Sequence, residues 1–179
     1  MLKLLRLIED HLEWEDVLAY IDTLLGGGYK DLMHESAGET SRDYLDQAIA
    51  AYERGMTLDL NDYYPASNLP RLSRLRGGRG DEERAAEVAT IVLAACQAGV
   101  EHRPWDDWAL PTRLGAAFDK GDVELARDLV AQIRRRGITD KQLKTTIRDL
   151  ELSLSLQKRR RVRAGLRGVL KSFRALGRE

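Results

Sequence analysis

The chain has 179 residues, of which 43% are hydrophobic and 32% charged, and its formal net charge is zero. Pro is scarce and runs of β-branched residues are almost absent, which favours an all-α protein of one domain. No apolar run reaches the roughly 18 residues of a membrane span, acidic residues follow the N-terminus too early for a secretory signal, and the lone Cys96 excludes an internal disulfide, so we expect a soluble, cytoplasmic protein.

The first elements read as helices separated by glycines. Apolar residues at helical spacing predict a helical region over residues 2–24. The three glycines 26–28 are expected to end it, because each loses much backbone entropy in a helix, and a short helix is expected over 29–35. After a loop, Ser41 is the predicted N-cap of a helix that ends near Gly55.

The middle of the chain carries three further helix patterns. A helix is expected to begin near Pro65 and to be shortened or kinked at Pro70. The next is predicted to begin at Asp81 and to be closed by Gly99. Asp106 or Asp107 is then expected to cap a helix that extends towards a turn at 121–122.

In the last third of the chain, the sequence predicts helices with clear ends. Gly137 is expected to end the helix that follows the turn at 121–122, and Thr139 with Asp140 opens the final region. Two apolar stripes in that region are out of phase across Lys158. This pattern indicates either one long helix that changes face or two helices that meet.

Large and small residues alternate as in paired antiparallel helices. Leu25, Gly26 and Tyr29 are followed by Ala48, Tyr52 and Gly55, and a second such pair contains Leu114, Gly115, Phe118, Ala126 and Val130. In a tetratricopeptide unit, small residues let two helices approach closely while aromatic rings fill the groove between them. We therefore predict an all-α, tetratricopeptide-like α-hairpin solenoid.

Several segments resemble the TRAF-binding-domain family, in the same order and over roughly Trp14 to Leu156. They are YKD after LLG, YLDQAIAAYERG, YYPASNLPRL, DDWALPTRLGAAFDKGD and KTTIRDLELSLSL. That family is best known from the regulatory region of the apoptosis signal-regulating kinases and also occurs in bacterial proteins that resemble signalling or defence components. The resemblance implies a tetratricopeptide-like, non-catalytic module that commonly sits beside an effector domain. Gly27 and Gly28 replace a basic and an aliphatic residue of the family pattern, so a contact of that basic residue is not carried over.

The sequence predicts binding of a protein, and possible partners are an effector domain encoded nearby and a second copy of the chain. Polar and aromatic residues in the first turns of solenoid helices often line the concave face, although packing between helices is an alternative role for them. Trp108 is expected in the core, whereas Trp105 beside Pro104 could anchor a partner. The candidate partner-binding residues are Tyr29, Lys30, Tyr63, Tyr64, Asn68 and Trp105.

Residue patterns for catalysis, metals or cofactors are weak. His11, His34 and His102 are far apart without metal-ligand spacing, and Cys96 lies on an apolar helix face. The glycines 26–28 follow no strand and precede no GK[ST] motif, which argues against a phosphate loop. We expect no catalytic residue, no metal site and no cofactor.

The C-terminal segment 158–179 carries nine basic residues and one acidic residue, a net charge of +8 against −8 for the rest. We expect a tetratricopeptide-like domain over 1–157 and a basic amphipathic helical segment over 158–179, packed on that domain or extending from it. The segment could dock on the acidic body or a second subunit, bind an acidic protein, or bind nucleic acid or an anionic membrane. Its candidate binding residues are Arg159, Arg160, Arg161, Arg163, Arg167, Lys171 and Arg174.

Overall fold

A computed structural model describes residues 14–58, 62–102 and 106–178. These residues form α-helices, one short 3₁₀ helix and no β-strand, so the predicted all-α class is confirmed. None of the described helices combines the length and the apolar character that crossing a bilayer requires. The elements are α2 (Trp14–Glu35), α3 (Gly38–Leu58), α4 (Tyr63–Arg76), α5 (Asp81–His102), α6 (Ala109–Lys120), α7 (Val123–Arg136), α8 (Asp140–Leu156), α9 (Arg160–Arg174) and η1 (Ala175–Arg178).

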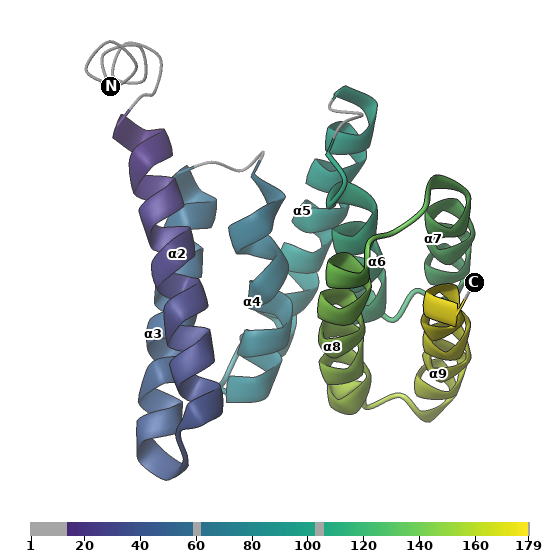
Figure 1. Ribbon diagram of the computed structural model, residues 1–179. Helices are drawn as coiled ribbons and strands as arrows, with labels where there is room; N and C mark the ends of the chain where they lie inside the picture. Colours follow the sequence, from purple (N-terminus) through teal and green to yellow (C-terminus); the bar gives the residue numbers. More distant parts are fainter. Residues whose placement is uncertain (1–13, 59–61, 103–105, 179) are drawn as a thin grey trace, which may run out of the picture.

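The helices pack as successive hairpins, which confirms the predicted α-hairpin solenoid (Figure 1). Helix α2 packs on α3, α4 on α5 and α6 on α7, while α8 and α9 form the last pair. Neighbouring hairpins meet through α3 and α4 and through α5 and α6, and α8 packs on α6. Helix α4 also contacts α2, α6 and α8, so the first helices of the hairpins share one face of the stack.

The hydrophobic core consists of two clusters of buried side chains. The first extends from α2 to the inner side of α6 and contains Tyr52 and Val88. The second joins α6 to α9 and contains Phe118, Leu150 and Phe173. The apolar face of the basic C-terminal helix α9 therefore packs on the body of the protein against α7 and α8. The domain boundary at 157/158 stays a prediction.

The predicted helix break at glycines 26–28 is wrong, because α2 continues through all three residues to Glu35. A Cβ atom added to Gly26 would lie 2.8 Å from ring atoms of Tyr52. Tyr52 is fully buried in α3, so a side chain at residue 26 would push the two helices apart. The close contact of α2 with α3 outweighs the backbone entropy that the glycines lose.

Substituting alanine for Gly26 is expected to destabilise the protein, whereas the same change at Gly168 should stabilise it. Both residues lie inside helices, so both gain about 0.5–1 kcal/mol from helix propensity. A Cβ at Gly168 meets no atom within 4 Å, but at Gly26 it overlaps the Tyr52 ring, at a cost of about 1–3 kcal/mol. Urea unfolding of both variants measures the difference, and equal stabilities would contradict the close contact.

Three other predicted boundaries differ from the structure. Helix α3 begins at Gly38, before the predicted N-cap Ser41, whose hydroxyl donates instead to the carbonyl of Met33 at 2.9 Å. Helix α4 continues past Pro70 to Arg76, because the burial of this face compensates the hydrogen bond that Pro70 cannot donate. Helix α5 continues past Gly99 to His102. For α4, tertiary packing therefore outweighed local propensity.

The predicted end of α6 and the predicted boundaries at 121–122, 137 and 139 agree with the structure. The start of α6 differs, because its N-cap is Trp108 and neither Asp106 nor Asp107. Gly121 ends α6 in the left-handed region at φ 74°, and Asp122 caps α7 by accepting from the Leu125 amide at 3.0 Å. Gly137 follows α7, and Thr139 caps α8 in a capping box. The out-of-phase stripes belong to two helices, α8 and α9, and not to one long helix.

Candidate partner-binding groove

A cavity of about 370 Å³ opens on the face that the first helices of the hairpins share. Helices α2 and α8 stand on either side of α4 in Figure 1, and all three contribute lining residues together with α6. We call this cavity the groove. Its described lining residues are Lys30, Tyr64, Ser67, Asn68, Arg71, Trp108, Pro111, Thr112, Gly115, Lys141, Thr145, Thr146, Arg148 and Asp149.

Three of the predicted partner-binding residues meet in the groove. The Lys30 ammonium from α2 donates to the Asn68 side-chain carbonyl at 2.9 Å, and Asn68 donates through its amide to the Tyr64 carbonyl at 3.2 Å. Asn68 is buried, whereas the side chain of Tyr64 is 51% exposed at the rim. These contacts join the first and second hairpins at one polar site.

The other three predicted residues, Tyr29, Tyr63 and Trp105, are not among the described lining residues of the groove. The Tyr29 ring stacks on Tyr44 of α3 with 6.4 Å between ring centroids. Tyr63 is buried and donates its hydroxyl to the Asp106 carboxylate at 2.6 Å. Tyr63 therefore takes the packing role that was its alternative, and Tyr29 packs on α3. Trp105 lies outside the described residues. Trp108, expected in the core, is only half-buried and lines the groove.

Sequence reasoning missed most of the charged lining of the groove. Arg71 of α4 and Lys141 and Arg148 of α8 were not predicted. A signal was present in the spacing, because Tyr64, Asn68 and Arg71 are four and three residues apart and thus form a polar stripe on a buried helix. Lys141 and Arg148 are likewise seven residues apart, on one face of α8.

A buried ion pair holds Arg71 at the groove. Its Nη1 lies 2.8 Å from a carboxylate oxygen of Asp119 in α6, its Nη2 donates to the Ser67 carbonyl at 2.6 Å, and Asp149 is 3.9 Å away. Asp119 also accepts from the Ser153 hydroxyl at 2.6 Å. Burial raises the pKa of Asp119, and Arg71 and Ser153 oppose that rise. The ion pair thus connects α4, α6 and α8. Both the Arg71 guanidinium and the Asp119 carboxylate have charged or polar partners.

Gly115 belongs to the same arrangement. A Cβ at this residue would lie 3.4 Å from Nη1 of Arg71. The motif glycine of the third hairpin therefore faces α4 and the groove, whereas the sequence predicted that it would bring α6 close to α7. Phe118, Ala126 and Val130 of the same motif are buried, as the pattern predicted.

The groove is predominantly cationic. Among its described lining residues, Lys30, Arg71, Lys141 and Arg148 are basic and Asp149 is acidic. Burial lowers the pKa of Lys30, and the Asp149 carboxylate partly restores it. This half-buried ammonium has lost part of its hydration, so an anionic group placed beside it is a favourable partner.

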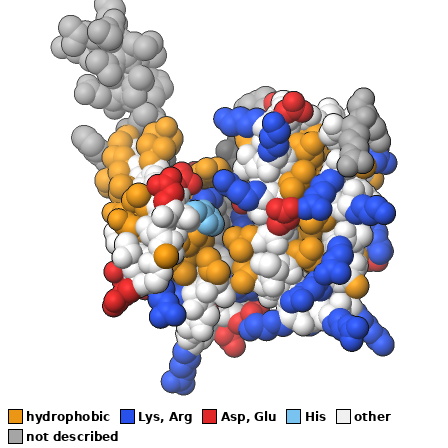
Figure 2. Space-filling view, turned by 60° about the horizontal axis from the view of Figure 1, so that its bottom comes forward, with side chains coloured by type: hydrophobic (Ala, Val, Ile, Leu, Met, Phe, Trp, Pro, Cys, Tyr) orange, Lys and Arg blue, Asp and Glu red, His pale blue; other side chains and the backbone are white. Residues whose placement is uncertain are grey.

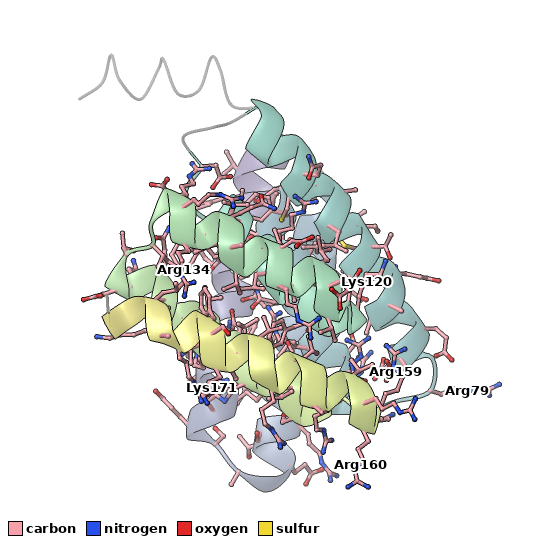
Figure 3. The ribbon with its side chains drawn as sticks, turned by 90° about the vertical axis from the view of Figure 1, so that its right-hand side faces the viewer. Arg79, Lys120, Arg134, Arg159, Arg160 and Lys171 are labelled. Carbon is pink, nitrogen blue, oxygen red and sulfur yellow. The ribbon has the colours of Figure 1, made fainter. Side chains whose placement is uncertain are left out.

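The basic C-terminal segment forms a second polar surface. In Figure 3, labelled basic side chains surround α9, including Arg159, Arg160 and Lys171. Arg159 donates to the Lys120 carbonyl at 3.2 Å and Arg163 to the Gln157 carbonyl at 2.8 Å. Arg174 pairs with Glu151 of α8. Within the part of the chain that the structure describes, four exposed basic residues of α9 have no ion-pair partner: Arg160, Arg161, Arg167 and Lys171.

The described residues contain no group of three or more His, Cys, Asp or Glu side chains placed to hold a metal ion. Cys96 is fully buried in the first core cluster. His34 is exposed near the end of α2. The other two histidines have no described side chain.

Comparison with known proteins gives a partial match to one family model. The family model described as Tetratricopeptide Repeats-Sensor matches residues 4–73, which is less than half of the chain. The match supports a tetratricopeptide-like region and does not itself point to the TRAF-binding-domain family. Neither the curated proteins nor the solved structures gave a match. Tetratricopeptide-like regions are generally non-catalytic and commonly mediate protein interactions, which supports a protein partner in general.

Proposed function

We propose that this chain is a non-catalytic protein-interaction and regulatory scaffold module whose groove receives a carboxylate-bearing segment of a protein partner. The observation that carries the proposal is the cationic lining, in which basic residues from three hairpins converge on one 370 Å³ cavity. Because these residues come from separate helices, only the folded solenoid presents them together. Binding of the partner would then require that the module is folded.

The groove offers three kinds of contact to such a segment. Arg71 is buried and Lys30 is half-buried, so their attraction to a carboxylate is less screened by water than that of an exposed side chain. Arg148 and Lys141 are exposed on α8 and steer the segment by long-range charge. The exposed ring of Tyr64 and the half-buried Trp108 supply apolar surface for a neighbouring side chain.

The same proposal extends to the biological setting. We propose a signalling role, or a role in bacterial defence, with an effector domain encoded nearby as the partner. The resemblance to the regulatory region of the apoptosis signal-regulating kinases supports this setting, and so does the word "Sensor" in the description of the matching family. The module would regulate the effector domain through binding alone, without making or breaking a covalent bond.

Selection of peptides from a random displayed library tests the groove directly. We expect the selected peptides to be enriched in Asp and Glu, and Arg148→Glu should weaken binding of a selected peptide by about tenfold or more. The matched control is Lys144→Glu, which makes the same kind of charge change on the same helix at an exposed residue outside the groove lining. Isothermal titration calorimetry measures both.

Two results would contradict this function. One is enrichment of basic or uncharged peptides. The other is an equal loss of affinity in Arg148→Glu and Lys144→Glu, since that would attribute binding to net charge and not to the groove. Circular dichroism of both variants controls for folding.

The outer face of α9 supports a second candidate function, which is binding of nucleic acid or an anionic membrane. The supporting observation is the set of exposed basic residues without ion-pair partners in the described part of the chain, Arg160, Arg161, Arg167 and Lys171. Such binding should fall steeply with salt and disappear in the Arg160→Glu, Arg167→Glu double variant. Single-stranded oligonucleotides and phosphatidylserine vesicles are the probes, and retention of binding in the double variant would exclude this candidate.

A further inference from the structure

Helix α2 carries apolar residues on two opposite faces, and only one of them is covered. Ala19, Gly26 and Met33 face inward and are buried. On the opposite face, large apolar side chains are between 40% and 64% exposed. We call these residues the outer stripe of α2: Leu18, Tyr20, Ile21, Leu24, Leu25 and Leu32.

Helix α2 is the first described helix of the stack, and its packing on α3 does not account for a second apolar face. Helices at the end of a repeat stack normally present a polar outer face to water. A helix that is apolar on all sides is typical of an interior position. Figure 2 shows hydrophobic side chains gathered at the α2 and α3 end of the molecule, whereas basic side chains predominate towards α8 and α9. At these exposed fractions, the outer stripe amounts to on the order of 500 Å² of apolar surface, a size that is often functional.

We infer that the outer stripe binds the outer stripe of a second copy of this chain, with the two α2 helices antiparallel about a two-fold axis. Leu18, Ile21, Leu25, Gly28 and Leu32 follow one another at intervals of three, four, three and four residues. That alternation is the seam of a two-helix coiled contact. Because a two-fold interface uses the same patch on both copies, one stripe with this period is sufficient for both sides.

Gly28 sets the register of the pair. A Cβ at Gly28 would meet no atom within 4 Å, so the glycine leaves an open notch in the stripe. In the antiparallel pair, Leu25 of one copy fills the notch at residue 28 of the other, and Ile21 packs against the other copy's Leu32. Two stripes together bury on the order of 1,000 Å² of apolar side-chain surface, which reaches the size that a specific interface requires.

The charges around the stripe favour a second copy over other parts of this protein. The stripe residues are all uncharged, and the exposed face of α9 is basic, so α9 of another copy could cover the stripe only by desolvating arginines. Lys30 points to the groove from a different side of α2, about half a turn from the centre of the stripe. The pair therefore leaves both grooves open.

Sedimentation equilibrium of the full chain over a wide concentration range tests the interface. We expect a reversible dimer, and Leu25→Glu should weaken it by on the order of a hundredfold because two carboxylates would enter an apolar contact. The matched control is Leu75→Glu at the end of α4, since Leu25 is 43% exposed and Leu75 is 41% exposed. Helical content by circular dichroism should stay unchanged in both variants.

Disulfide trapping tests the antiparallel register independently. An equimolar mixture of the Ile21→Cys and Leu32→Cys chains should form a disulfide-linked dimer under mild oxidation, while neither variant alone should do so. Trapping of Ile21→Cys with itself would indicate a parallel pair and would overturn the inference. So would a chain that stays monomeric at every concentration, or a dimer that Leu25→Glu and Leu75→Glu weaken equally.

Discussion

Replacing Asp119 with alanine is expected to lower the free energy of unfolding by about 3–5 kcal/mol, since it leaves the Arg71 guanidinium buried without its main counter-charge. Arg71 is 5% exposed and Asp119 is 4% exposed, so water cannot take the place of the lost carboxylate. Asp149, 3.9 Å from Arg71, offers partial compensation and places the expected loss towards the lower end of this range. Urea unfolding followed by circular dichroism measures the change.

Removing both charges should restore most of the lost stability. The Arg71→Met, Asp119→Leu double variant is expected to unfold with a free energy closer to that of the unmodified chain, because two apolar side chains of similar volume need no pairing. Arg127→Ala serves as the control, since its pair with Glu124 is exposed and should change stability by less than about 0.5 kcal/mol. A double variant as unstable as Asp119→Ala would show that packing, and not the unpaired charge, causes the loss.

Replacing Phe173 with alanine is expected to cost about 3–5 kcal/mol of unfolding free energy. This ring of α9 is fully buried and belongs to the same cluster as Leu114, Leu129 and Leu150 of the preceding helices. The cavity left by the ring would loosen the contacts of α6, α7 and α8 as well as those of α9. Hydrogen exchange should therefore accelerate in all four helices.

The Phe173 result also tests the predicted domain boundary at 157/158. If 158–179 were an independent appendage, the Phe173→Ala variant would lose protection in α9 alone and the rest of the chain would unfold as before. The control is Arg167→Ala on the exposed side of the same helix, which should change stability by less than about 0.5 kcal/mol. A loss confined to α9 would favour the separate segment.

Local signals made much of the fold predictable from the sequence. Helical periodicity, the capping pair Thr139 and Gln142, and the turn at Gly121 depend on residues within one or two turns of each other. The glycines of α2 were misread for the opposite reason. What keeps Gly26 helical is Tyr52, which is distant in sequence, so the local entropy cost was visible while the compensating contact was not.

The groove was only partly predictable because three hairpins build it. Lys30, Tyr64 and Asn68 could be identified as polar or aromatic residues in the first helices of the hairpins. Arg71 and Arg148 could not be placed beside them until the stacking of α4 against α8 was known. The neighbours Tyr63 and Tyr64 illustrate the limit, since one ring is buried and the other is exposed at the rim.

The two ends of the described helix stack carry unlike surfaces, which disfavours polymerisation. At one end α9 turns its arginines to water, and at the other end α2 exposes leucines. Head-to-tail contact between copies would place these unlike surfaces together and desolvate the guanidinium groups, which is unfavourable. An open filament is therefore disfavoured, and a pair of copies joined through α2 would be a closed assembly with a basic surface at each outer end.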